Sequence, residues 1–248
     1  MQLIELQDYI GSELAVSRFK DYCPNGVQVE GRAEVRRIAT GVTASQAVLD
    51  AATAWGADAI LVHHGYFWRS EDASITGIKK RRIAHLLRHD VSLLAYHLPL
   101  DAHPEWGNNA QLGKRLGFIE EGRFGEQDIA CHGRLLAPKS LDKLKLGIAE
   151  SLQREPQVIG DLGANITRVA WCSGGGQGYF EQAISLGVDV FVTGEASEQC
   201  FHLAQETGVA FIAAGHHATE RFGIQVLGEH LAVHFGVEHR YFDQDNPI

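Results

Sequence analysis

The stretch Ala57-Asp58-Ala59-Ile60-Leu61-Val62-His63-His64-Gly65 decides the fold, because a short apolar run ends abruptly in two adjacent histidines. Consecutive aliphatic residues between two glycines predict a fully buried strand of a parallel sheet, although a buried helical turn fits the same pattern. Open α/β sheets bind ligands at the carboxyl ends of their strands. Both imidazoles therefore fall where a binding site is expected.

The two histidines allow two interpretations. Neighbouring side chains on a regular strand point to opposite faces, so one metal ion could not easily take both rings. If the strand breaks at Gly65, His63 and His64 can diverge into one cavity and each hold a different ion. The alternative is one core histidine and one solvent histidine, and this stretch alone favours neither.

Length and composition are those of a soluble globular protein, with 248 residues, 45% hydrophobic and 21% charged. This length predicts one large domain or two of ~100 to 150 residues. No run approaches the ~18 apolar residues of a membrane span. The first residues are acidic and lack a basic flank before an apolar core, so we expect no secretory signal. The cysteines are scattered without paired spacing, and we expect a cytoplasmic protein with reduced thiols.

The net charge of −9 argues against a nonspecific binder of nucleic acid or of anionic membranes. One basic run exists, Lys79-Lys80-Arg81-Arg82. We interpret it as the solvated face of a helix over about 78–88, in preference to a phosphate site or a subunit contact.

Strand and helix patterns alternate along the chain, which predicts a parallel α/β sheet. The expected helices cover residues 2–11, 45–55, 78–88, 109–116, 141–152 and 198–206. The expected strands cover residues 27–29, 37–42, 57–63, 91–97, 130–136, a short segment around 158, and 209–214, and the repeat described below adds 168–170 and 188–192. The stretch 122–166 does not resemble a flexible linker and is expected to connect two halves.

The second half of the chain repeats the first at a constant offset. Arg168 corresponds to Arg37, and Gly187 corresponds to Gly56. The differences 168 − 37 and 187 − 56 are both 131. A constant offset across strand, helix and strand indicates duplication of a βαβ unit. We expect two similar α/β domains, residues 1–124 and 125–248, whose halves can interlace, with a metal site between them.

Each half also has a histidine that leaves a strand, followed four positions later by a carboxylate. These pairs are His97 with Asp101 and His216 with Glu220. His216 and Glu220, four apart at the expected start of a helix, share one face and can share an ion. Histidine and carboxylate ligands together suit Zn, Mn, Fe or Co rather than Mg or Ca.

Carboxylates that bridge two cations offset the repulsion between ions ~3.5 to 4 Å apart. Incomplete ligation leaves room for water, as a catalytic site needs. The predicted ligands of a dinuclear site are His63, His64, Asp101, His216 and Glu220.

Further candidates are less specific. His97, His217 and Glu195 can either ligate a metal directly or orient a ligand and its water. His103 is expected to serve its proline-containing loop. The remaining histidines considered, interpreted as surface or core residues, are His132, His230, His234 and His239.

The glycine-rich loop Ser173-Gly174-Gly175-Gly176-Gln177-Gly178 could present backbone N–H groups to an anion. It matches neither the dinucleotide fingerprint nor the P-loop, because its glycine spacing is wrong and no Gly-Lys-Ser/Thr follows. We favour a tight turn with close backbone packing over a phosphate cradle.

Several long motifs in this order resemble the family labelled GTP cyclohydrolase 1 type 2 homologue, also described as dinuclear-metal-centre hexameric proteins. They are Asn25 to Gly31, Gly41 to Ser45, His63 to Trp68, His97 to Pro104 and Gly215 to Glu220. The resemblance spans nearly the whole chain and implies two similar α/β domains, a toroidal homohexamer and two metal ions per subunit. It implies ligation by the same five residues and corresponds to the compact form without an inserted domain.

The leading functional hypothesis is a metal-dependent hydrolase acting on a small, nucleotide-like substrate through a metal-bridging water, as in cyclohydrolase chemistry. His97 or Glu195 would transfer the proton. The metals would be divalent Fe, Mn or Zn. The rival hypothesis is a metal-handling or metal-chaperone protein without turnover, and a ring acting on nucleic acid is disfavoured by the acidic charge.

Overall fold

A computed structural model describes residues 1–248, which form two compact units. Unit 1 comprises residues 1–100 and 223–245, and unit 2 comprises residues 101–222 and 246–248. Each unit contains a sheet flanked by helices, which confirms the α/β prediction. The sequence predicted a boundary between the two copies of the repeat at residues 124 and 125, and this boundary stays a prediction.

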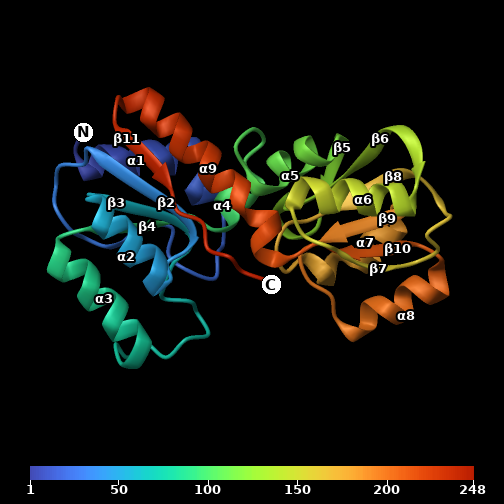
Figure 1. Ribbon diagram of the computed structural model, residues 1–248, viewed down its shortest axis with the longest axis horizontal. Helices are drawn as coiled ribbons and strands as arrows, with labels where there is room; N and C mark the ends of the chain where they lie inside the picture. The colour runs from blue at the N-terminus through green and yellow to red at the C-terminus, as the bar shows by residue number, and fades with distance from the viewer. The chain divides into compact units, whose positions relative to one another are not determined.

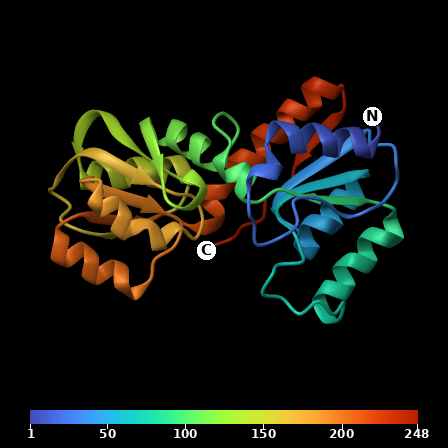
Figure 2. The same ribbon diagram turned by 180° about the vertical axis from the view of Figure 1, so that it is seen from behind.

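Unit 1 has a five-stranded sheet in which β1 alone runs antiparallel to its neighbour. The strand order is β1 (Gly26–Val29), β4 (Ser92–Ala95), β3 (Ala59–His64), β2 (Arg37–Thr43) and β11 (Glu238–Tyr241). One face carries α1 (Leu3–Glu13) and the unit 1 part of α9 (His216–Phe235), and the other carries α2 (Gln46–Trp55) and α3 (Gly77–His89) (Figures 1 and 2). The basic run lies on α3, where Lys80 and Arg81 are exposed as expected for a solvated face.

Unit 2 has a six-stranded sheet with a parallel centre. The strand order is β5 (Phe118–Phe124), β6 (Ala130–Ser140), β8 (Asn165–Trp171), β9 (Val190–Thr193), β10 (Ala210–Ala213) and β7 (Gln157–Ile159). One face carries α5 (Asn108–Leu116) and α6 (Leu141–Leu152), and the other carries α7 (Phe180–Ser185) and α8 (Glu198–Thr207) (Figures 1 and 2). The short helix α4 (Leu98–Ala102) follows β4.

The duplication predicted from the sequence is present in the sheets. The order β1-β4-β3-β2 in unit 1 matches β7-β10-β9-β8 in unit 2, with an antiparallel edge strand beside parallel strands in both. Asp58 Oδ2 accepts the backbone N–H groups of Arg36 and Arg37 at 2.8 and 2.9 Å. Asp189 Oδ2 accepts the corresponding N–H groups of 167 and 168, both at 2.8 Å. The repeat therefore extends to the hydrogen bonds that start each central strand pair.

Local signals explain several element ends. Ser45 and Ser140 accept the N–H groups of Val48 and Lys143, as N-caps of α2 and α6. At Gly56 the backbone is left-handed, with φ +84°, and this ends α2 before the buried strand begins.

The four cysteines are buried and free. None of the helices combines the length and apolar character needed to cross a bilayer.

Replacing Asp58 or Asp189 by alanine is expected to lower the free energy of unfolding by about 1 to 3 kcal/mol, because two backbone N–H groups lose their carboxylate acceptor. Chemical denaturation measures the change. Asp50→Ala on the exposed side of α2 is the control and should change stability by less than about 0.5 kcal/mol. Equal effects at Asp50 and Asp58 would contradict this role.

Candidate metal centre

The strand β3 ends in two histidines whose rings lie together in unit 1. The ring centroids of His63 and His64 are 4.6 Å apart. Gly65 makes this turn possible, since a Cβ there would overlap Gln28 Oε1 and lie 2.6 Å from Ala95 Cβ. The strand therefore breaks where the sequence predicted, and the two imidazoles share one neighbourhood.

The tautomer of His63 is determined by its backbone partner. This ring is fully buried, and its Nδ1 lies 2.9 Å from the carbonyl oxygen of Tyr96. A carbonyl can only accept, so Nδ1 donates, and in the neutral ring Nε2 has the lone pair that a metal ion would bind. His64 Nδ1 lies 3.2 Å from Thr43 Oγ1. A metal-ligating imidazole has this arrangement, with its second nitrogen held by an oxygen.

His97 joins this pair as a third imidazole. Its ring centroid lies 5.0 Å from that of His63 and 5.9 Å from that of His64. The donor atoms of these three histidines all lie within 4.8 Å of one another. Unit 1 thus presents a cluster of three nitrogen donors suited to Zn, Fe, Co or Ni.

Asp21 anchors His97 and was not identified from the sequence. Its Oδ1 accepts His97 Nδ1–H at 2.7 Å, and its Oδ2 accepts the N–H of Leu98 at 2.9 Å and Asn25 Nδ2 at 2.9 Å. Burial raises the pKa of Asp21, but hydrogen bonding and charge from His97, with further donors, outweigh this effect and lower the pKa overall. No spacing links residue 21 to residue 97, so only the folded chain reveals the pair.

Cys23 lies beside the same pair but is a poor metal ligand there. The donor atoms of Asp21, Cys23 and His97 are within 4.8 Å of one another. Burial, with a smaller contribution from Asp21, raises the pKa of Cys23 to about 12, so the thiol stays protonated. Because the Asp21 oxygens already accept several hydrogen bonds, this carboxylate serves to orient His97.

In unit 2, the first turns of α9 bring His216 and Glu220 together. His216 Nε2 lies 3.0 Å from Glu220 Oε2, and its Nδ1 lies 2.6 Å from Glu195 Oε1. Burial lowers the pKa of His216, but hydrogen bonds and charge from Glu220 and Glu195 raise it to about 9 overall. A metal ion at Nε2 would take the place of this proton, since a ligating imidazole is neutral.

Asp101 is a buried carboxylate on α4, and its surroundings hold it in place. Its Oδ1 accepts Asn108 Nδ2 at 2.8 Å and Ser173 Oγ at 3.3 Å. Asn109, the next residue on α5, accepts the N–H of Ser173 at 2.8 Å. The ligand candidates of unit 2 are therefore oriented by neighbours, as metal-ligating carboxylates usually are.

The glycine-rich loop is a packing element. The N–H groups of Ser173, Gly174 and Gly176 already donate to Asn109 Oδ1, Thr219 Oγ1 and Thr193 Oγ1. These groups cannot cradle an anion without losing those acceptors, which supports the tight-turn interpretation. Gly174 has φ +63°, and a Cβ there would overlap Glu220 Oε1 and lie 3.1 Å from His216 Nε2.

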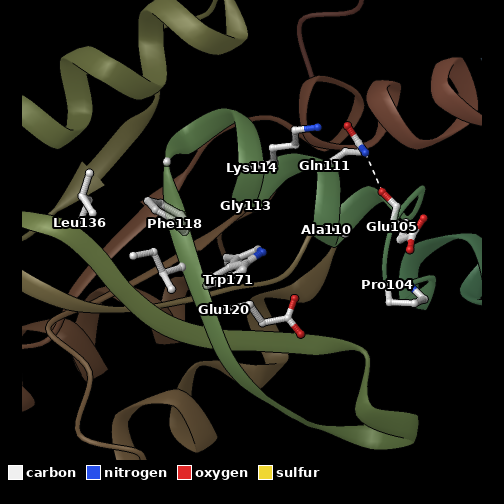
Figure 3. Close-up of a pocket in the computed structure, with 12 residues that line it drawn as sticks. Pro104, Glu105, Ala110, Gln111, Gly113, Lys114, Phe118, Glu120, Leu136 and Trp171 are labelled. Carbon is white, nitrogen blue, oxygen red and sulfur yellow. Dashed lines mark hydrogen bonds between the residues drawn. The ribbon is translucent and has the colours of Figure 1, made fainter.

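A cavity of about 650 Å³ opens elsewhere in unit 2, between α5 and β5 (Figure 3). Figure 3 shows Leu136, Phe118 and Trp171 on its apolar side, with Lys114 and Glu105 at its rim. No histidine or cysteine lines it, so it lacks the nitrogen and sulfur donors found in the histidine cluster.

The other histidines have local partners. His103 Nδ1 accepts the N–H groups of Glu105 and Trp106, at 3.3 and 3.0 Å, as expected of a loop residue. His217 is buried, and its backbone N–H donates to the carbonyl of Ile248 at 3.0 Å. His230 Nε2 lies 2.6 Å from Tyr9 Oη, and His239 Nε2 lies 2.8 Å from Thr40 Oγ1.

Comparisons with known proteins cover the whole chain. The model of the Duf34/NIF3 (NGG1p interacting factor 3) family matches residues 1–247. A protein of Neisseria meningitidis serogroup B named GTP cyclohydrolase 1 type 2 homolog is 56% identical over 234 residues, which are 94% of each chain. The solved structure of protein ybgI, described as of unknown function, has a TM-score of 0.97 at 47% identity, covering 100% of both chains. The protein TTHA1606 from Thermus thermophilus has a TM-score of 0.91 at 33% identity, also covering 100% of both chains.

Gly174→Ala should force Glu220 and His216 out of their positions and strain a left-handed backbone, lowering the free energy of unfolding by about 1 to 3 kcal/mol. Denaturation of the metal-free protein measures this change. Gly178→Ala in the same loop is the matched control, since a Cβ there meets nothing within 4 Å. If both variants were equally stable, the packing role of Gly174 would be wrong.

Glu195→Gln should weaken Zn²⁺ binding by about 10- to 100-fold, because the amide no longer holds His216 as the carboxylate does. Competition with a chromophoric chelator measures the affinity. Glu198→Gln is the control, since Glu198 also pairs with a histidine, His202, at 3.6 Å, but with its side chain 90% exposed. Unchanged affinity in Glu195→Gln would show that the anchoring bond is not needed.

Proposed function

Because the chain belongs to the Duf34/NIF3 family, we propose that it is a metal-dependent hydrolase acting on a small, nucleotide-like substrate. The observation that carries this proposal is the anchoring of His63, His97 and His216 through Nδ1, because Nε2 of each ring is then the nitrogen that can bind a metal ion. Relatives at up to 56% identity are named GTP cyclohydrolase 1 type 2 homolog, which suggests purine ring opening as the reaction.

The proposed metal ligands are the five side chains expected from the sequence: His63, His64, Asp101, His216 and Glu220. Buried imidazoles and carboxylates, each held by a second hydrogen bond, fit a divalent cation such as Fe, Mn or Zn. Two divalent cations, when bound, lower the pKa of water and stabilise negative charge that develops on the substrate.

His97 is the proposed proton-transfer residue. Its Nδ1–H is held by the Asp21 carboxylate, so Nε2 can accept a proton while Asp21 stabilises the imidazolium that results. Glu195, the second candidate from the sequence, is bonded to His216 Nδ1, and we propose that it orients this ring.

We also propose a cytoplasmic homohexamer of toroidal form, with two ions per subunit and with neither membrane nor nucleic acid as a partner. The net charge of −9 supports the exclusion of nucleic acid. The alternative function, metal delivery without turnover, uses the same donors. Anchored ligands favour a resident site over ready release, because their geometry is fixed before the metal binds.

The test is elemental analysis of protein purified without added metal, followed by assays of GTP and other nucleotides with Mn²⁺, Fe²⁺ or Zn²⁺. We expect turnover that chelation abolishes and metal restores, and a loss of at least about 100-fold in His63→Ala and Glu220→Ala. Leu136→Ala, an exposed residue outside both clusters, is the control. Turnover that survives removal of all metal would overturn the proposal, whereas ready metal release to an acceptor without turnover would establish the metal-delivery alternative.

A further inference from the structure

Two aromatic side chains flank His97 in unit 1. The Trp68 ring lies nearly perpendicular to the His97 ring, at 89° and 4.9 Å between centroids, and 6.0 Å from His64. The Tyr22 ring lies 6.3 Å from His97. Trp68 follows β3 and Tyr22 precedes β1, so two separate segments supply these rings. The three-histidine cluster therefore has an aromatic border.

The backbone next to Trp68 is in a strained conformation. Phe67 has φ +64°, in the left-handed region that a bulky side chain rarely adopts. Its ring packs against the core of unit 1, with Lys79 Nζ 5.5 Å from the ring centroid. The left-handed residue lets Phe67 enter the core while Trp68 contacts the histidines. Strain of this kind is concentrated at functional sites.

The two aromatic segments are tied together. The backbone N–H of Arg69 donates to the carbonyl of Tyr22 at 2.7 Å, and Arg69 Nη2 donates to the carbonyl of Asp21 at 2.7 Å. Asp21 in turn anchors His97. Tyr22, Trp68 and His97 thus belong to one framework with fixed spacing.

The side chains of Tyr22 and Trp68 each have a polar group that can bind a ligand. Tyr22 is 51% exposed and Trp68 is half-buried. Neither the Tyr22 hydroxyl nor the Trp68 indole N–H has a hydrogen-bond partner within the chain. Aromatic side chains with an apolar face and an available polar edge suit a ligand that combines a flat ring with ring nitrogens and carbonyls.

We propose that Tyr22 and Trp68 form a wall that binds a planar nitrogen heterocycle beside the three-histidine cluster. This inference rests on the proposed function and assigns to it the part of the substrate that is recognised, the ring of a nucleobase. Stacking on aromatic faces tolerates different bases, since each base has a π-face. The wall therefore selects a planar ring over an aliphatic one and leaves the choice among bases to other contacts.

The experiment compares two probes, guanosine 5′-monophosphate and ribose 5-phosphate, which share sugar and phosphate and differ only in the ring. Equilibrium dialysis with the metal-loaded protein measures both affinities. We expect the wild type to bind the nucleotide at least about tenfold more tightly. The double variant Tyr22→Leu with Trp68→Leu should bind both probes equally, with unchanged metal content.

Conservative variants and a control keep the test independent of folding. Trp68→Phe and Tyr22→Phe should retain most of the preference because they retain the rings. Trp106→Leu, which removes a half-buried indole stacked on His103 in unit 2, should leave the preference intact. The proposed aromatic wall would be wrong if the wild type bound the nucleotide no more tightly than ribose 5-phosphate. It would also be wrong if the double variant still preferred the nucleotide. Loss of metal from the double variant would also overturn it, because the rings would then serve only to support the histidines.

The binding measurement separates this inference from the proposed function. If the wild type prefers the nucleotide but hydrolyses none, the hydrolase proposal fails and the aromatic wall stands. If turnover occurs without any preference for the ring, the wall fails and the hydrolase proposal stands.

Discussion

The candidate chemistry depends on one constraint, the fixing of histidine tautomers by oxygen acceptors at Nδ1. A backbone carbonyl holds His63, and carboxylates hold His97 and His216. Each bond places the hydrogen on Nδ1. The lone pair of Nε2 can then bind a cation or accept a proton. Without these acceptors the rings could rotate or change tautomer, and each Nε2 would be a poorly positioned metal ligand. The strand ends and the short α4 matter because they position the acceptors as well as the histidines.

The rest of each fold supports these strand ends by the same means in both units. A carboxylate at the start of the second parallel strand, Asp58 or Asp189, accepts two N–H groups of its neighbour. Arg37 and Arg168 are the corresponding neighbours in the two copies. The copies differ at the far ends of those strands, where His63 and His64 correspond to Gly194 and Glu195. Duplication thus preserved the framework while the donor sets diverged, nitrogen-rich in unit 1 and carboxylate-rich in unit 2.

Much of this was predictable from the sequence, since apolar runs, caps and the repeat carry their own signals. The strands β5 and β11 were not predicted. Residues 238–241 are mostly polar, and this segment becomes a strand only through its parallel pairing with β2. Asp21 and the strained Phe67 were also missed, because their roles arise from contacts with distant residues and from backbone geometry. The ligand candidates could be found because a histidine and a carboxylate spaced by one helical turn reflect local geometry.

Anomalous X-ray diffraction from crystals of the protein purified without added metal tests the account most directly. Data at the absorption edges of Mn, Fe and Zn identify the metal and locate it relative to each imidazole. The account predicts peaks about 2.0 to 2.2 Å from Nε2 of His63 and of His216, opposite the anchored Nδ1 atoms. Peaks on the Nδ1 side, or at Cys23 in place of the histidine cluster, would contradict it.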